Sequence, residues 1–175
     1  MITRNTLRIA QYNVAMTSPR AQSVSDRLRD GSDNALRRIS SVIAAVDPDI
    51  LLLCEFDQSG DGIDNGDVTA FIQNFLIPAG GSDYKYHCQV GVNTGLPYKR
   101  KGKPDISNKP DMAQGFGFHH GQYGFALLSR FPIEKSQLRT WQQFHWKDMP
   151  ENKMPEGTTP HGFNNNNASR QKVMR

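Results

Sequence analysis

The sequence has few cysteines, no long apolar run and only a small excess of one charge. Cys54 and Cys88 are the two cysteines among 175 residues, and Cys54 lies in an apolar segment, so we expect a buried free thiol there. No apolar run is long enough to cross a membrane, and the polar start of the chain does not resemble a signal peptide. The net charge of +4 is compatible with a phosphate-bearing partner but far below that of a dedicated nucleic-acid binder.

Length and composition predict one ordinary globular domain. The chain is 37% hydrophobic and 22% charged, and 175 residues are enough to bury a core. From residue 147 onward it is rich in Pro, Gly and Asn and nearly devoid of apolar side chains. We therefore expect the ordered domain to cover residues 1–146, and residues 147–175 to form a polar loop or disordered tail.

A strand–helix–strand unit is predicted near the amino terminus. Residues 7–15 begin with alternating apolar and polar side chains, as in a strand. Residues 34–46 carry apolar side chains at helical spacing, with Asp33 placed to cap the helix. Residues 50–56 read as a short strand covered on both faces. A helical crossover between the two strands indicates that they are parallel or share one sheet.

The rest of the chain predicts one more helix and two or three more strands. We expect a helix over 68–76 capped by Asp67, strands over 84–90 and 125–129, and a candidate strand over 138–146. Residues 91–122 form the longest irregular stretch, and long loops inside compact domains are usually functional or disordered.

Two oxygen-bearing side chains stand at the ends of the first two predicted strands. Asn13 ends the first strand and Glu55 ends the second. Because parallel strands present their carboxyl ends at one edge of a sheet, we expect Asn13 and Glu55 to meet. One carboxylate and one amide oxygen suit a hard cation such as Mg²⁺. The alternatives are a solvated acid at Glu55 and a turn-forming amide at Asn13.

The long loop contains the other candidates for substrate contact. The basic run Lys99, Arg100 and Lys101 is the best phosphate-attracting patch, with a solvated charge run as its alternative. Farther along, His120, Gln122 and Tyr123 precede the strand over 125–129 and are candidates for the substrate side. Adjacent histidines in a loop are more often solvated, and the sequence lacks the His and Cys spacing of a zinc site.

Two further clusters carry weaker signals. The acidic loop with Asp57, Asp61, Asp64 and Asp67 hints at Ca²⁺, but the EF-hand spacing is missing and a solvated acidic turn is favoured. An aromatic cluster near the end of the predicted domain is expected to be core or interface rather than a platform for base stacking; it comprises Trp141, Phe144 and Trp146.

Three segments resemble successive motifs of the endonuclease/exonuclease/phosphatase family. They are residues 7–15, residues 48–56 and residues 124–133, and their order and spacing match the amino-terminal half of that domain. The resemblance implies that Glu55 is the metal-ligating glutamate and Asn13 the asparagine beside the metal and the scissile phosphate. The implied fold is α/β (α+β), with a two-sheet β-sandwich flanked by helices in four layers, α/β/β/α.

The implied activity is Mg²⁺- or Mn²⁺-dependent hydrolysis of phosphoesters in nucleic acid or in small molecules. The family's later Gly-Asp-x-Asn and Ser-Asp-His motifs do not occur in these 175 residues. We therefore expect a fragment with an incomplete second sheet, inactive alone because it lacks the family's general base. The alternative is a non-catalytic scaffold or binding module with a weak metal site. The resemblance slightly favours an exported bacterial protein, and it does not indicate the oligomeric state.

Overall fold

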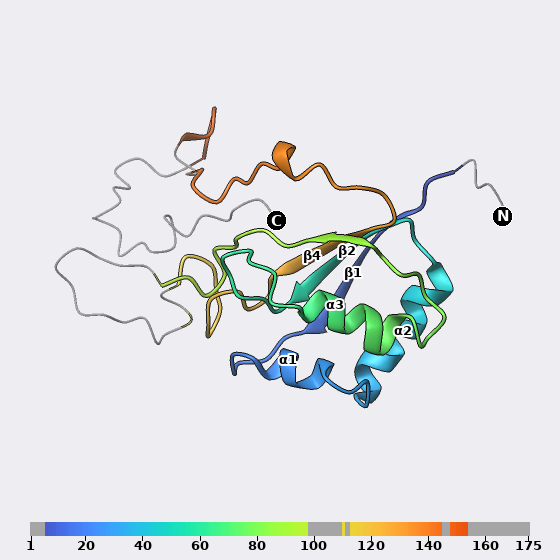
Figure 1. The fold of residues 1–175 in the computed structure, drawn as a ribbon. Coiled ribbons are helices and arrows are strands. Elements are labelled where there is room, and N and C mark those ends of the chain that lie inside the picture. Colours follow the sequence, from blue (N-terminus) through green and yellow to red (C-terminus); the bar gives the residue numbers. More distant parts are fainter. Residues whose placement is uncertain (1–5, 98–109, 111–112, 145–147, 154–175) are drawn as a thin grey trace.

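The computed structural model describes residues 6–97, 110, 113–144 and 148–153, and they form a mixed α/β fold (Figure 1). Its four strands are β1 (Ile9–Met16), β2 (Ile50–Phe56), β3 (Tyr86–Cys88) and β4 (Phe125–Ser129). They form one sheet in the order β1-β2-β4-β3, with β1 and β2 parallel and the other two pairs antiparallel. The predicted parallel pairing at the start of the chain is confirmed.

Helices cover one face of this sheet. They are α1 (Ser23–Leu28), α2 (Asn34–Val46), α3 (Asp67–Phe71) and the π-helical turn η1 (Ile72–Leu76); a 3₁₀ turn, η3 (Lys135–Gln137), follows β4. In the described part of the chain, no helix has the length and apolar content needed to cross a bilayer.

Helix α2 agrees with the sequence prediction at both ends. The Asp33 carboxylate accepts the backbone N–H groups of Ala35 and Leu36, which caps the first turn. Arg27 donates to the same carboxylate at 2.7 Å, and this hydrogen bond lowers the pKa of Asp33. The helix ends at Val46, and Asp47 follows in a left-handed conformation.

The second predicted helix differs in its start and in its winding. Asp67 is its first helical residue, and its buried carboxylate accepts hydrogen bonds from Ser25 Oγ and Asn65 Nδ2, so the predicted capping role is wrong. The helix also widens into η1 after Phe71. Helix α1 was not predicted at all.

Two predicted strands are shorter or missing. The strand expected over 84–90 is confined to Tyr86–Cys88, and residues 138–144 do not form a strand. Residues 145–147, and residues 154–175 of the predicted tail, lie outside the described residues. Both cysteines are free. Cys54 was expected to be a buried free thiol, and it is free but only half-buried, whereas Cys88 is buried.

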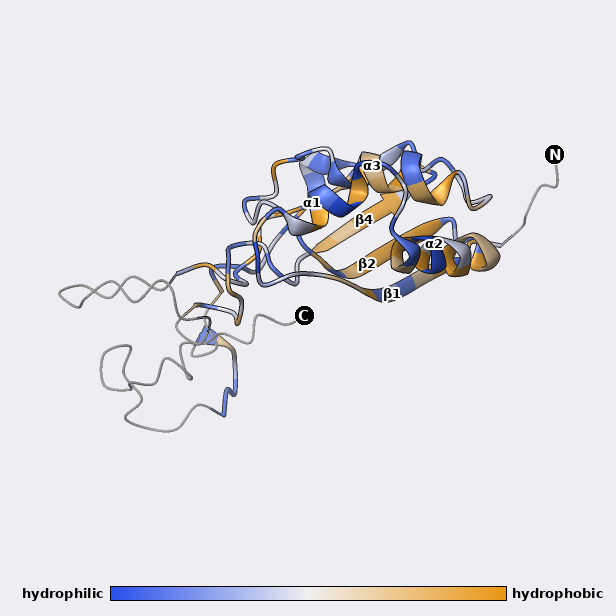
Figure 2. Ribbon diagram, turned by 90° about the horizontal axis from the view of Figure 1, so that it is seen from below, coloured by the Kyte–Doolittle hydropathy of each residue, from blue (hydrophilic) through white to orange (hydrophobic). Residues whose placement is uncertain are grey.

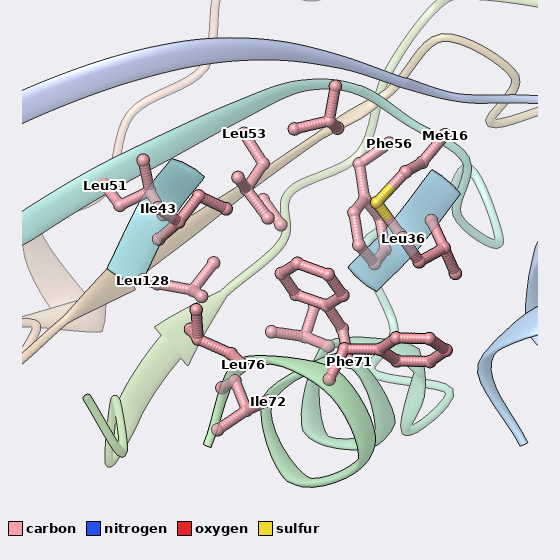
Figure 3. Packing of buried hydrophobic residues seen from close by; sticks show 14 of the residues in the cluster. Met16, Leu36, Ile43, Leu51, Leu53, Phe56, Phe71, Ile72, Leu76 and Leu128 are labelled. Atoms are coloured by element: carbon pink, nitrogen blue, oxygen red, sulfur yellow. The ribbon is translucent and has the colours of Figure 1, made fainter. Parts of the chain in front are cut away.

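The core lies between the helices and the sheet face that they cover. Figure 2 shows hydrophobic residues concentrated along β2 and β4, with further hydrophobic residues in the helices beside them. Figure 3 shows side chains from β2, α2, α3 and η1 meeting there; those labelled include Leu51, Leu53, Phe56, Leu36, Ile43, Phe71, Ile72 and Leu76. Each fully buried side chain of this size stabilises the fold by about 1.5–3 kcal/mol.

The opposite face of the sheet is covered less completely. On this outer face Ile9 and Phe125 are exposed, and Leu52 and Leu127 are half-buried. The described residues therefore contain one sheet with one fully packed face. A second sheet, as expected from a four-layer sandwich, is not among them.

Candidate functional site

The backbone is irregular where β1 and β2 end side by side. The register pairs Asn13 with Cys54 and then Met16 with Phe56, so β1 carries one extra residue, a β-bulge. Within this region Ala15 has φ 47° and Glu55 has φ 57°. Left-handed conformations cost a non-glycine residue about 1–2 kcal/mol, and such strain gathers at functional sites.

The left-handed turn at Glu55 keeps an acid out of the core. Along β2, Leu51 and Leu53 point into the core, and strict alternation would place Glu55 there next. Instead the chain turns at Glu55, and Phe56 fills the next core position with no exposed surface. Glu55 is left half-buried at the end of the strand.

The Glu55 carboxylate has no protein partner in the described part of the chain. No hydrogen bond or ion pair joins it to another described residue. Its oxygens are also absent from the buried polar atoms that lack a partner, so they remain accessible to solvent. The Glu55 carboxylate is therefore free to accept a ligand at the end of the strand.

Asn13 lies beside this strand end and is exposed. Its Oδ1 accepts the backbone N–H of Ala15 at 3.1 Å, which is the turn-forming role considered as its alternative. Its Nδ2 makes no hydrogen bond to another described residue. The amide can thus donate to an anion while its oxygen supports the bulge.

Asp57 connects the loops around this strand end through hydrogen bonds. It is buried and accepts the backbone N–H groups of Ser18 and Tyr123, each at 2.9 Å. The Nε2 atom of His119 lies 3.6 Å from its carboxylate. Sequence reasoning placed Asp57 only in an acidic loop, although an acid two residues after Glu55 was a signal for a structural role at the site.

Most of the chain, including the ends of β1 and β2, lies within a segment that matches a known protein family. The model described as the Endonuclease/Exonuclease/phosphatase family matches residues 10–172, nearly the whole chain. The chain belongs to this family. No curated protein and no solved structure matches it. Members of the family generally hydrolyse phosphoesters and typically depend on a divalent metal.

The strand edge offers a small donor set for the family's metal. Among the described residues, no three His, Cys, Asp or Glu side chains converge on one point. One carboxylate with a neighbouring amide suits Mg²⁺, which keeps several waters and takes oxygens from the substrate phosphate. The same pair is too small for the closed cages of structural zinc. Glu55 and Asn13 are thus of the donor types that suit a Mg²⁺-type ion, and Glu55 is the charged one of the two.

The acidic loop does not assemble a calcium cage in the described structure. Asp61 accepts from Ser59 Oγ and from the Ile63 N–H, and the Ser59 hydrogen bond lowers the pKa of its carboxyl. Asp64 accepts the N–H of Gly66. Each of these carboxylates thus accepts hydrogen bonds from residues within its own turn, and they do not converge on one cation position.

The loop histidines face the protein interior. His119 places Nε2 3.0 Å from the carbonyl of Ser18 and Nδ1 3.3 Å from the carbonyl of His120. His120 places Nε2 2.9 Å from the carbonyl of Val92. These contacts join neighbouring loops, and the substrate role of His120 stays a prediction.

The remaining predicted substrate residues are placed differently from one another. Gln122 has no exposed surface, and its Oε1 accepts the Phe118 N–H at 2.7 Å. Tyr123 is half-buried, with φ 57° and its ring 6.2 Å from that of Phe116. Lys99, Arg100 and Lys101 lie outside the described residues. The substrate roles of all five stay predictions.

Two glycines let the loops approach one another closely. A Cβ atom on Gly95 would lie 1.7 Å from the carbonyl oxygen of His119, and one on Gly121 would lie 2.0 Å from that of Gln58. Both glycines also have positive φ. Their replacement would therefore separate the loops that surround the strand edge.

Proposed function

We propose that this chain provides the metal- and phosphate-binding edge of a Mg²⁺- or Mn²⁺-dependent phosphoester hydrolase. The observation that carries the proposal is the Glu55 carboxylate, which is half-buried, held on left-handed backbone and without a partner among the described residues. Glu55 holds the cation. When bound, the cation polarises a phosphoryl oxygen and neutralises developing charge.

Asn13 orients the phosphate in this proposal. Its Nδ2 donates to a non-bridging phosphoryl oxygen, while its Oδ1 stays on the Ala15 N–H. Asn13 pairs with Cys54, the residue before Glu55, and the β-bulge begins directly after Asn13. The strand pairing therefore holds the Asn13 backbone next to that of Glu55. Asn13 therefore acts as a positioning donor, and metal ligation through its second oxygen lone pair is a lesser part of its role.

The proton acceptor for the attacking water comes, in this proposal, from outside the described residues. The imidazoles of His119 and His120 contact main-chain carbonyls, and that of His87 lies 3.3 Å from Thr69 Oγ1. This observation also favours a second candidate function, a module that binds metal and phosphate without turnover.

The finer features of the fold and substrate belong to the same proposal. The incompletely covered outer face, with Ile9, Leu52 and Phe125, packs against a second sheet in the complete four-layer sandwich. The basic run at Lys99–Lys101, proposed from its charge alone, contacts phosphates of a nucleic acid or small phosphoester.

Metal binding tests the role of Glu55. Titration of the chain with Mn²⁺, followed by isothermal calorimetry and water-proton relaxation, is expected to show at least about tenfold weaker binding in Glu55→Gln. Glu134→Gln is the matched control, since Glu134 is exposed and accepts hydrogen bonds from Ser136. Equal Mn²⁺ affinity in the native chain and Glu55→Gln would contradict the proposal.

Turnover distinguishes hydrolase from binding module. The chain alone is expected to be inactive, so hydrolysis of bis(p-nitrophenyl) phosphate by the native chain in Mn²⁺ would overturn that expectation. Any such hydrolysis should fall about 100-fold in Asn13→Ala, because a transition-state donor is lost, while Mn²⁺ affinity changes less than about twofold. Mn²⁺ binding without any turnover by the native chain would favour the binding module instead.

A further inference from the structure

Exposed aromatic rings gather on the loop that leads into β4. Phe116 and Phe118 are 48% and 50% exposed, with ring centroids 5.8 Å apart in an edge-to-face arrangement. The Tyr123 ring lies 6.2 Å from that of Phe116. Large aromatic side chains are costly to leave in water, so an exposed group of them indicates a binding surface.

This group lies one strand away from Glu55. The Tyr123 N–H donates to Asp57 Oδ1, and the Phe56 N–H donates to the carbonyl of Gly124 at 3.0 Å. Neighbouring strands are about 4.8 Å apart, so residues 123–125 run directly beside residues 54–57. In Figure 1 this loop, drawn in yellow, lies at the end of the sheet toward which the β2 arrow points.

A second aromatic pair is joined to the first through Asn93. Trp141 is 60% exposed and packs edge-to-face with Phe144, their centroids 5.6 Å apart. Asn93 Nδ2 donates to the carbonyl of Gln142 at 2.8 Å, and the carbonyl of Asn93 accepts the N–H of Gly115 at 2.9 Å. The residue next to Trp141 and the residue next to Phe116 thus share one partner. Of the two roles expected for Trp141, core or interface, its exposure excludes the core.

We infer that these rings, Phe116, Phe118, Tyr123, Trp141 and Phe144, form an aromatic surface that stacks the unpaired bases of a single-stranded nucleic acid next to the phosphate site. The inference rests on the proposed function, because it names the substrate class of the same edge. Every base has a π-face, so such a surface accepts bases with little regard to sequence.

The geometry favours bases over a lipid surface. Both edge-to-face pairs have interplanar angles near 80°, so their rings are not stacked on each other and keep faces for another ring. The rings are held by hydrogen-bonded loops that run beside the proposed phosphate site, so a ligand bound there would present its phosphates and its rings side by side. A polyanion with rings attached to its phosphates matches both features.

The test measures base binding without metal. Fluorescence anisotropy in EDTA compares labelled dT12, rU12 and an abasic DNA dodecamer, so that the phosphate number is equal and only the bases differ. We expect dT12 or rU12 to bind at least tenfold more tightly than the abasic strand. Whichever of dT12 and rU12 binds more tightly indicates whether the surface prefers DNA or RNA. Phe118→Ala and Trp141→Ala are each expected to weaken binding of the based strand about tenfold.

Control variants separate stacking from loss of structure. Phe131→Ala removes a phenyl ring that is 49% exposed and follows β4 at the opposite end of the sheet, and it should leave binding unchanged. Phe118→Trp keeps a ring and should retain affinity. Phe118→Ala weakening binding no more than Phe131→Ala, equal affinity for abasic and based strands, or no detectable binding would overturn the inference.

Two further arms identify the cause of a negative result. Binding to phosphatidylcholine vesicles that Phe118→Ala abolishes, with dT12 and rU12 affinity unchanged by the same substitution, would overturn the inference in favour of a lipid surface. Glu55→Gln should lose Mn²⁺ affinity but keep dT12 or rU12 affinity in EDTA within about twofold. The Mn²⁺ titration therefore tests the metal site, and strand binding in EDTA tests the aromatic surface, so either proposal can fail without the other.

Discussion

The charged side chains at the two ends of β2 differ in whether they have partners. At its amino-terminal end, Arg130 donates to Asp47 and Asp49, and the Arg8 N–H donates to the second oxygen of Asp49. At its carboxyl-terminal end, Glu55 has no partner among the described residues. At the amino-terminal end, ion pairs and hydrogen bonds therefore connect the strands to the helix. At the carboxyl-terminal end, the Glu55 carboxylate has no such connection to another described residue.

The comparison shows that an acid's surroundings, more than its burial, indicate its role. Asp49 is more deeply buried than Glu55, yet its hydrogen bonds make it a structural residue. Both ends contain a left-handed residue, Asp47 with φ 49° and Glu55 with φ 57°. They differ in that Asp47 is paired with Arg130, whereas Glu55 has no partner among the described residues.

Breaking the paired end should have the largest effect. Arg130→Leu removes the guanidinium from two carboxylates, one of them buried, and is expected to lower the free energy of unfolding by about 3 kcal/mol in urea titrations at pH 7. Arg29→Leu is the control: its ion pair with Asp26 is exposed, so the loss should be below about 0.5 kcal/mol. Equal effects of the two substitutions would remove the contrast between structural and surface pairs.

High pH should weaken the same end by a smaller amount. Tyr84 is buried and donates to the carbonyl of Pro48 at 2.6 Å, and burial raises its pKa to about 12 from 10.0. The stabilisation is present below pH 10, where Tyr84 is neutral folded or unfolded, and is lost as pH rises toward 12, because the unfolded chain ionises first. Two pKa units correspond to about 2.7 kcal/mol at most.

Urea titrations between pH 9 and pH 11.5 measure this loss. Tyr84→Phe cannot ionise, so it should lack this part of the pH dependence, at the cost of about 1 kcal/mol for the missing hydrogen bond. Parallel pH profiles of the two proteins would show that Tyr84 is not the group responsible.

At the open end, substitution should stabilise. Glu55→Asn removes an unpartnered charge and tolerates left-handed backbone, so the free energy of unfolding without divalent metal should rise by about 0.5–1 kcal/mol. Ala15→Gly relieves strain on β1 and should give a similar gain while leaving Mn²⁺ binding intact. A loss of stability in Glu55→Asn would mean that Glu55 supports the fold, and the comparison would fail.

Local signals were enough to predict several elements. Helix α2 has a side-chain cap at Asp33 and apolar residues at helical spacing, and both act within a few residues of sequence. Helix α1 escaped prediction because it has only six residues and two buried side chains, Val24 and Leu28. The widening at η1 carries no local signal, since packing decides where a helix gains a residue per turn.

The placement of Asn13 and Glu55 at neighbouring strand ends was predictable, but the backbone conformation there was not. Strand ends and family resemblance indicated Asn13 and Glu55, but glutamate has no preference for left-handed backbone. That conformation depends on Phe56 filling the core, which is a tertiary event. Likewise, hydrophobicity alone does not decide whether Trp141 is buried. Burial depends on which side chains pack against it, and the neighbouring sequence does not indicate them.

The close approaches at Gly95 and Gly121 have a consequence for how this protein can be altered. Loops that interlock through backbone contacts cannot be exchanged one at a time, so grafting a single loop from another enzyme should disrupt its neighbours. The exposed rings at 116 and 118 project from that frame without supporting it. Variants designed to test the proposed aromatic surface should therefore keep the two glycines and change the rings alone.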